Sequence, residues 1–343
     1  MITDKLNYTF IYFMESYQLF LVTLLIVPFL IMAINKLCFK YKILDIPDHR
    51  KSHISPTPIS GGITIFFTSL IVLNYLNTLS FDYLKFYLDI FIYSTILFLL
   101  GLFDDVKKIN TNIKTIIILI LLLTFLLISN DLNIIFLKFN YLFNKTFVLE
   151  YLSIPFTLFC LFMLFNALNY ADGKNGISIS LSIFWLSYIV LNININFLII
   201  LEILLVLFLL LIFNLKNKLF LGNSGVNFIS TFVGLLIIKS YNTQNINLFC
   251  DEIFLLLLIP GIDAGRVTIY RIIKKKSPLS PDKKHLHHYI EKYAPNNYVW
   301  LIYLFLSILP ILILKVTDNF FISLLFSCFL YFLCLKPIPF KFN

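Results

Sequence analysis

The chain has 343 residues, of which 59% are hydrophobic and only 13% are charged, and its formal net charge is +9. This composition excludes a soluble globular domain, whose interior would be too small to bury so much apolar surface. The basic charge does not require a nucleic-acid partner, and we expect none, because multi-pass membrane proteins concentrate Lys and Arg in their cytoplasmic loops.

Apolar runs of the length that a helix needs to cross a bilayer recur along the whole sequence. We therefore predict an all-α polytopic integral membrane protein, folded as a single membrane-embedded domain over residues 1–343. Runs such as "TIIILILLLTFLLIS" do not alternate as the strands of a membrane β-barrel would. About 11 transmembrane helices are expected, at residues 17–37, 59–78, 84–103, 113–130, 152–170, 176–195, 197–215, 225–241, 250–272, 298–316 and 319–336. The polar run 131–150 is expected to lie outside the membrane, with a short hairpin around "FNKTF".

Eleven spans divide the connecting segments into two sets with very different charge. Counting the residues at the adjoining helix ends, the set 38–58, 104–112, 171–175, 216–224, 273–297 and the C-terminus carries about 21 of the 27 Lys and Arg. This asymmetry predicts that these loops and the C-terminus are cytoplasmic and that the N-terminus lies outside.

The unusual polar stretches all adjoin the predicted cytoplasmic ends of helices. They are "DIPDHRKSHISPTPISGG" (45–62), "GLFDDVKK" (101–108), "NALNYADGKNG" (166–176), "LGNSG" (221–225), "PGIDAGR" (260–266) and "SPLSPDKKHLHH" (277–288). Their common location predicts one functional site on the cytoplasmic face.

Asp104 and Asp105 are adjacent carboxylates at the end of an apolar helix, where they repel each other and are costly near lipid. They could simply mark a helix end. A site for Mg²⁺ or for phosphate chemistry explains them better, because a hard cation relieves the repulsion and Lys107 and Lys108 supply positive charge.

Asn166, Asn169 and Asp172 follow one another at a spacing of three, which places them near one stripe of a helix as it leaves the membrane. Such groups are costly as packing and useful as a binding edge, although an Asn can also cap a helix.

In the stretch 45–62, prolines stiffen a cationic loop with Arg50, Lys51 and His53, just before a Gly-Gly helix start, which suits the capture of an anion. In "HLHH", His285, His287 and His288 lack the further ligands of a zinc site, and the surrounding Lys and Arg favour a phosphate. Alone, these histidines leave the choice open.

Together, "RKxHxxPxPxxGG", "DD", "NxxNxxDG" and "SPxSPDxxHxHH" resemble the polyprenyl-phosphate N-acetylhexosamine-1-phosphate transferase family over residues 40–295. The last motif resembles its WecA/TagO-like branch rather than the related phospho-MurNAc-pentapeptide translocase. The resemblance implies a bacterial inner-membrane enzyme with a cytoplasmic active site. It would transfer HexNAc-1-phosphate, by default GlcNAc-1-phosphate, from a UDP-N-acetylhexosamine to polyprenyl (undecaprenyl) phosphate. This is the first membrane step of a cell-surface glycan and releases UMP; a homodimer is left open.

The same resemblance implies roles for individual residues and a cofactor, Mg²⁺, with Mn²⁺ as an alternative. The implied catalytic residues are Asp104, Asp105, Asp172 and Asp263. The implied substrate-binding residues are Arg50, Lys51, His53, Lys108, Asn166, Asn169, Asn175, Arg266, His285, His287 and His288.

Asn223 is a departure within the implied metal set of Asp104, Asp105 and residue 223, where the family has Asp. An amide oxygen can ligate Mg²⁺ but brings no charge, so the affinity should fall. Two alternatives follow: a family-derived lipid-phosphate binder with altered catalysis, or a transporter. The transporter is disfavoured, because the predicted mid-helix positions are Ile, Leu and Phe and the ionisable groups gather at one face.

Overall fold

The computed structural model describes residues 2–47, 55–79, 81–193, 198–243, 247–280 and 282–335. Every apolar segment predicted from the sequence is helical in these residues. The long helices are α1 (Ile2–Tyr41), α2 (Gly61–Leu79), α3 (Phe81–Lys107), α4 (Thr111–Ile128), α5 (Ser153–Ala171), α6 (Ile177–Asn192), α7 (Leu198–Leu215), α8 (Gly222–Asn242), α10 (Leu258–Ile273), α12 (Val299–Thr317) and α13 (Phe320–Leu335).

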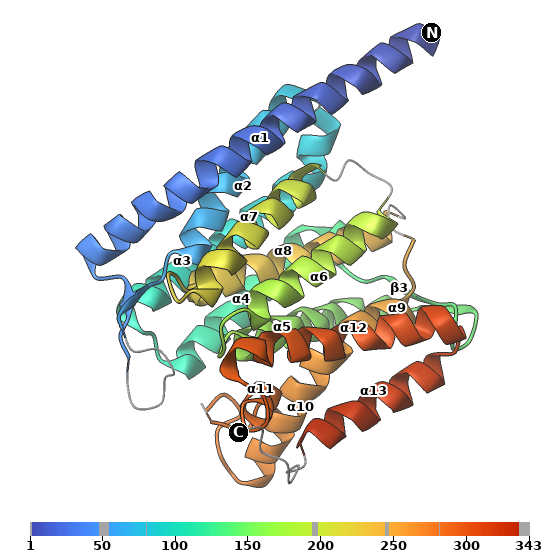
Figure 1. Cartoon of the computed structure of the whole chain (residues 1–343). Helices are drawn as coiled ribbons and strands as arrows, with labels where there is room; N and C mark the ends of the chain where they lie inside the picture. The colour runs from blue at the N-terminus through green and yellow to red at the C-terminus, as the bar shows by residue number, and fades with distance from the viewer. Residues whose placement is uncertain are drawn as a thin grey trace.

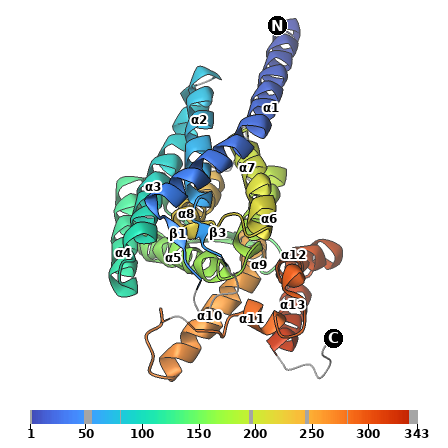
Figure 2. The same ribbon diagram turned by 60° about the vertical axis from the view of Figure 1, so that its left-hand side comes forward.

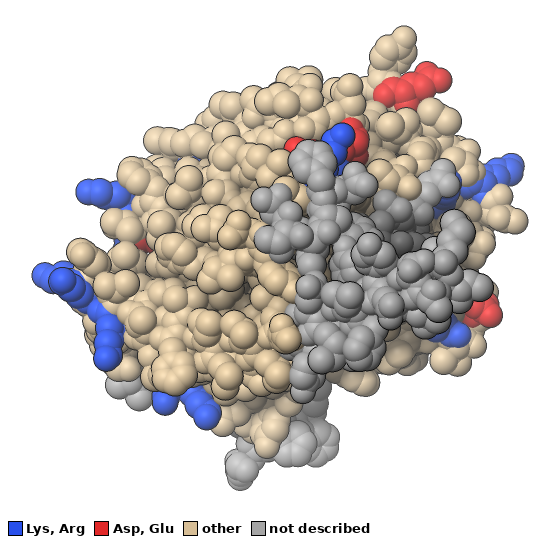
Figure 3. Space-filling view, turned by 90° about the horizontal axis from the view of Figure 1, so that it is seen from above, with Lys and Arg blue, Asp and Glu red and all other residues tan. Residues whose placement is uncertain are grey.

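The described residues contain seven helices that are long and apolar enough to cross a membrane, or eight if α9 (Cys250–Leu256) and α10 form one bent span. Helices α2, α6 and α13 contribute shorter apolar segments. The protein is thus a multi-pass helical membrane protein, while the number of eleven spans and the orientation of the termini stay predictions. Figure 3 shows a broad uncharged surface with charged side chains gathered mainly toward its two sides, as expected for a lipid-facing belt.

Helix α8 lies at the centre of the bundle, where it contacts α2, α3, α5 and α6 (Figures 1 and 2). Its residues 224–241 are all buried. At its N-terminal end the packing against α2 is close, because a Cβ on Gly62 would lie 2.2 Å from the backbone nitrogen of Gly225. This close contact brings the polar segment 221–225 next to the start of α2.

The segment predicted as one helix over 250–272 is instead broken at Leu257, and α9 and α10 meet at an angle of 68°. The physical reason is Pro260, which has no N–H to donate to the carbonyl of Leu256. The indole Nε1 of Trp185 donates to that carbonyl instead, at 3.2 Å. The break redirects α10 toward α5, α12 and α13, in the lower part of Figure 1. There Asp263 of α10 accepts the backbone N–H of Leu286, the first residue of the short helix α11 (Leu286–Ile290).

Short strands and 3₁₀ turns occupy the connections between helices. The predicted hairpin in 131–150 is confirmed as β3 (Phe136–Phe139) paired antiparallel with β4 (Lys145–Val148). It is anchored by Asp251 of α9, whose Oδ2 accepts the backbone N–H groups of residues 140–142. At the other end of the bundle, β1 (Leu44–Asp45) pairs with β2 (Thr57–Pro58). The 3₁₀ turns are Asn130–Leu132, Glu150–Leu152 and Asn296–Tyr298.

Candidate active site

Two adjoining cavities collect the polar stretches that the sequence separates. The first, of about 330 Å³, is lined mainly by α4, α5, the end of α10 and the segment leading into α11. The second, of about 920 Å³, is lined by residues from β1, the end of α3, the turn after α5 and the start of α8. Gly173 and His288 line both cavities. Five of the six polar stretches contribute lining residues. The sixth, 260–266, lines neither cavity but contacts the histidine segment, through the hydrogen bond between Asp263 and His285.

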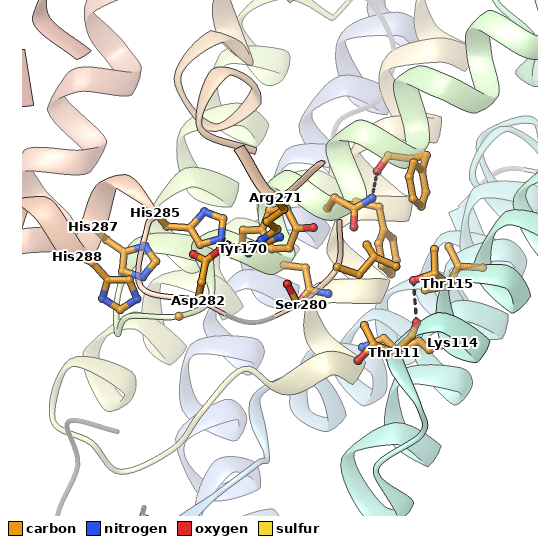
Figure 4. Close-up of a pocket in the computed structure, with 17 residues that line it drawn as sticks. Thr111, Lys114, Thr115, Tyr170, Arg271, Ser280, Asp282, His285, His287 and His288 are labelled. Atoms are coloured by element: carbon orange, nitrogen blue, oxygen red, sulfur yellow. Dashed lines mark hydrogen bonds and ion pairs between the residues drawn. The ribbon is translucent and has the colours of Figure 1, made fainter. Parts of the chain in front are cut away.

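Asp104 lines neither cavity, but it forms a buried ion pair with a residue that lines the first. Its Oδ2 accepts a hydrogen bond from Lys114 Nζ at 2.7 Å, and the two side chains are 9% and 10% exposed. The same ammonium donates to Asn223 Oδ1 at 2.6 Å. Lys114 lies in the first turn of α4 and lines the first cavity, as Figure 4 shows. The ion pair therefore brings a buried ammonium group to the wall of this cavity.

Asp105 caps the start of α8. Its Oδ1 accepts the backbone N–H and side-chain amide of Asn223, and its Oδ2 accepts the backbone N–H and hydroxyl of Ser224, all at 2.8–3.0 Å. A carboxylate at this position satisfies N–H groups that have no partner within the helix. Gly222 makes the contact possible, because its φ is +75° and a Cβ there would lie 2.1 Å from Ile59 Cγ2.

The oxygens of the predicted metal set already accept hydrogen bonds from the protein. Asp104 Oδ1 accepts from Ile109 N, and Asp104 Oδ2 and Asn223 Oδ1 both accept from Lys114. Among the described residues, no group of three or more His, Cys, Asp or Glu is arranged to hold a metal ion. In this conformation the residues do not fit Mg²⁺, because the ammonium of Lys114 lies between the ligands that the ion would need.

The "NxxNxxD" stripe spans both cavities. Asn166 and Asn169 line the first, and Asp172, which ends α5, lines the second together with Asn175. Loss of hydration raises the pKa of Asp172 to about 7, and the neighbouring Asp105 and Asp45 carboxylates act in the same direction. A hydrogen bond from the Ser178 hydroxyl opposes this rise. Asp172 is therefore a carboxyl group that can exchange a proton near neutral pH.

His285 is held on both sides by charged groups from α10. Its Nδ1 lies 3.0 Å from Asp263 Oδ2, and its Nε2 lies 3.3 Å from Arg271. Because an arginine can only donate, Nε2 is the acceptor and Nδ1–H donates to Asp263. Asp263 also accepts from Arg266, Tyr331 and the backbone of Leu286. This buried network fixes the start of α11.

His287 and His288 lie at one end of the first cavity, opposite Lys114 (Figure 4). Both ring nitrogens of His287 are buried without a protein partner. Burial lowers the pKa of this imidazole to about 3, helped by its His288 and His285 neighbours, so it is neutral near pH 7. His288 borders both cavities, and its Nδ1 lies 3.1 Å from Glu291 Oε2.

Some predicted site residues lie away from the two cavities or are not described. Lys108 is exposed after the end of α3 and lines neither cavity. Arg266 lines neither cavity and binds Asp263, Tyr331 and the carbonyl of Lys284. The predicted anion-capturing residues Arg50, Lys51 and His53 lie outside the described residues.

Sequence reasoning missed several charged residues of this site. Lys114 carried a signal, as an isolated lysine at the start of a very apolar helix. Arg271 was not missed, since it is one of the Lys and Arg around the histidines that favour a phosphate; the structure shows that it is 1% exposed and donates to Asp282. Lys174 and Glu291, paired at 2.5 Å, are 117 residues apart and gave no sign of their contact.

The fold and the site together define a multi-pass α-helical membrane protein with two adjoining cavities at one end of its bundle, lined by both basic and acidic side chains. The model of glycosyl transferase family 4 matches residues 87–241. A probable undecaprenyl-phosphate N-acetylglucosaminyl 1-phosphate transferase of Bacillus subtilis is 26% identical over 298 residues, which cover 84% of this chain and 80% of the relative.

An undecaprenyl-phosphate α-N-acetylglucosaminyl 1-phosphate transferase of Thermotoga maritima is 28% identical, over 76% of this chain and 77% of the relative. The undecaprenyl-phosphate α-N-acetylglucosaminyl 1-phosphate transferase of Escherichia coli K12 is 26% identical, over 75% of this chain and 71% of its own length. The chain is thus similar to glycosyl transferase family 4 over residues 87–241 and, over most of its length, to undecaprenyl-phosphate N-acetylglucosaminyl 1-phosphate transferases.

Proposed function

We propose that this protein transfers N-acetylhexosamine-1-phosphate, by default GlcNAc-1-phosphate, from a UDP-sugar to polyprenyl phosphate. The products are a polyprenyl-diphosphate-sugar and UMP. The relatives are named for this transfer to undecaprenyl phosphate. The observation that carries the proposal is the adjoining pair of cavities at the helix ends, in which Lys114, Arg271, the histidines and Asp172 come together.

The reaction joins two anions, one of them a lipid. An oxygen of the polyprenyl phosphate attacks the β-phosphorus of the UDP-sugar, a new P–O bond forms, and the bond from that phosphorus to the bridging oxygen breaks, so that UMP leaves. The protein's task is to position the two phosphates in line and to offset their charge. Lys114 is suited to this because it is a buried ammonium on the cavity wall.

The other polar residues divide between contact and support. Asn166, Asn169, His287 and His288 face the cavities and are proposed to bind substrate, while Asp172 holds or releases a proton near neutral pH. Asp263, Arg266 and His285 are proposed to act through the histidine helix, which they hold in place.

The predicted location and cofactor remain part of the proposal. The bias of Lys and Arg favours a site facing the cytoplasm in a bacterial inner membrane. The exposed Lys108 and the basic loop with Arg50, Lys51 and His53 are proposed to attract anions to it. Mg²⁺ or Mn²⁺ dependence stays an expectation to be tested, and no step is derived through the ion, because Lys114 lies among its expected ligands.

The direct test uses purified protein in detergent with undecaprenyl phosphate, Mg²⁺ and a panel of UDP-HexNAc donors. UMP that forms only when the lipid phosphate is present would support the transferase and name its donor. Lipid-phosphate binding without UMP release, in protein shown to be folded, would favour the non-catalytic binder instead.

A further inference from the structure

Glu291 links two segments of the site that are far apart in the sequence. Its Oε1 accepts a hydrogen bond from Lys174 Nζ at 2.5 Å, and its Oε2 lies 3.1 Å from His288 Nδ1. Lys174 belongs to the turn that follows Asp172, whereas Glu291 and His288 belong to α11 and its C-terminal end. One carboxylate therefore joins the turn at the end of α5 to the histidine helix.

The carboxylate is ionised and its position is well fixed. The hydrogen bond from His288 is the main reason that the pKa of Glu291 is lowered to about 2, and Lys174 acts in the same direction. The Lys174 side chain is only 8% exposed, so its ammonium has little access to water as an alternative partner. An ion pair of this kind restricts the side chains that make it.

The hydrogen bond determines which nitrogen of His288 is available to a ligand. A carboxylate only accepts, so Nδ1 carries the proton and Nε2 is left without a protein partner in this contact. His288 borders both cavities, which makes it the side chain at the junction between the two substrate spaces. To accept a hydrogen bond from a ligand at this junction, a neutral imidazole must have an unprotonated nitrogen facing the cavities.

We propose that Glu291 is a positioning residue that fixes the tautomer and orientation of His288 at the junction of the two cavities, and that Lys174 holds Glu291 in place. This inference rests on the proposed function for its kinetic consequence. Its structural content, the proton on Nδ1 of His288, is independent of that function.

The test compares Glu291→Gln, which keeps an oxygen acceptor for Nδ1–H, with Glu291→Leu, which keeps none. The chain has only five histidines, so ¹⁵N-histidine labelling gives a spectrum in which His288 is assigned by its loss in His288→Gln. The full-length protein in detergent is used, with UMP release measured against UDP-HexNAc concentration. Glu150→Gln, an exposed change between the β3–β4 hairpin and α5, is the matched control.

The expected spectrum of the parent shows His288 protonated at Nδ1, and Glu291→Leu shifts the proton toward Nε2 while Glu291→Gln does not. Activity should follow, with kcat/KM for the UDP-sugar about 10–100-fold lower in Glu291→Leu and within about fivefold in Glu291→Gln. The kcat/KM of Lys174→Met should lie between the values of these two variants.

A parent protein in which His288 carries its proton on Nε2 would overturn the proposal. So would equal losses of activity in Glu291→Gln and Glu291→Leu if the tautomer of His288 is the same in both as in the parent. If Glu291→Leu does not fold, the parent spectrum together with Glu291→Gln and Lys174→Met still decides. A parent that releases no UMP would refute the proposed function but leave the tautomer comparison intact.

Discussion

Replacing Lys114 by Met separates the structural from the functional part of its role. Met has nearly the same length but no charge, so Lys114→Met leaves the Asp104 carboxylate buried without its partner. We also consider Asp104→Asn in the same chain, which removes that buried charge. Asp104→Asn alone is the reference, because Asp104 is itself an implied catalytic residue. Lower turnover in the double variant than in Asp104→Asn alone would show that Lys114 also binds substrate and does not only neutralise Asp104.

The magnitude follows from burial. Both side chains of the pair are about nine-tenths buried, and removing one partner of a buried ion pair costs about 3–5 kcal/mol. In a protein of this size the melting temperature should fall by roughly 4–7 °C. Turnover should fall by about 10²–10³-fold, the usual effect of losing one preorganised donor to a developing charge. The double variant Lys114→Met with Asp104→Asn should regain much of the stability but none of the turnover.

Thermal unfolding in detergent and UMP release, measured on the same preparations, check these values. Asn112→Ala, which removes an exposed neighbour on the same helix end, is a suitable control. A Lys114→Met protein with parental melting temperature and turnover would refute the reasoning outright. Recovery of both stability and turnover in the double variant would show that Lys114 is structural alone.

Three further predictions concern the metal, the pH dependence and the histidine contact. Asn223→Asp places a negative charge beside Lys114. If the parent depends on Mg²⁺, the Mg²⁺ concentration that half-saturates UMP release should fall about tenfold, and if it does not, the variant should become Mg²⁺-dependent. An unchanged Mg²⁺ titration would argue against a metal at this position. Asp172 has a raised pKa of about 7, so its carboxylate forms and turnover should rise as the pH rises through 7. Its contribution to stability is fully present below the ordinary pKa of 3.8 and is lost as the pH rises from there through 7. Ser178→Ala removes a hydrogen bond that favours the carboxylate and should move that rise to higher pH; no movement would contradict the assignment. A Cβ on Gly173 would lie 2.9 Å from His287 Nε2, so Gly173→Ala should displace the imidazole ring. Both Gly173→Ala and His287→Ala should raise the KM for the UDP-sugar by about tenfold without a large fall in melting temperature. If both variants aggregate instead, the contact has a structural role.

Much of the architecture could be predicted from the sequence because lipid imposes a simple rule on it. A segment in hydrocarbon must satisfy its own backbone and present apolar side chains, so runs such as 113–130 and 298–316 predict helices without any knowledge of their neighbours. The hairpin in the polar run 131–150 was also predicted from the sequence, and the structure confirms it. The break at Leu257 was not predicted, although Pro260 lies in the middle of the predicted helix 250–272, because a proline inside a membrane helix can also be accommodated without breaking it.

The candidate site divides in the same way. The sequence by itself determined which residue types belong to it, since Asp172, His287 and the paired aspartates stand out as costly groups beside apolar helices. Their partners were decided only by the tertiary structure, since Lys114 reaches Asn223 across 109 positions and Lys174 reaches Glu291 across 117. Tertiary contacts also decided that Asp105 caps α8 and that His287 is neutral, because hydration, charge and hydrogen bonding at a buried group depend on what packs around it. Local sequence specifies the cost of placing a group in the membrane, and only the packed bundle specifies how that cost is offset.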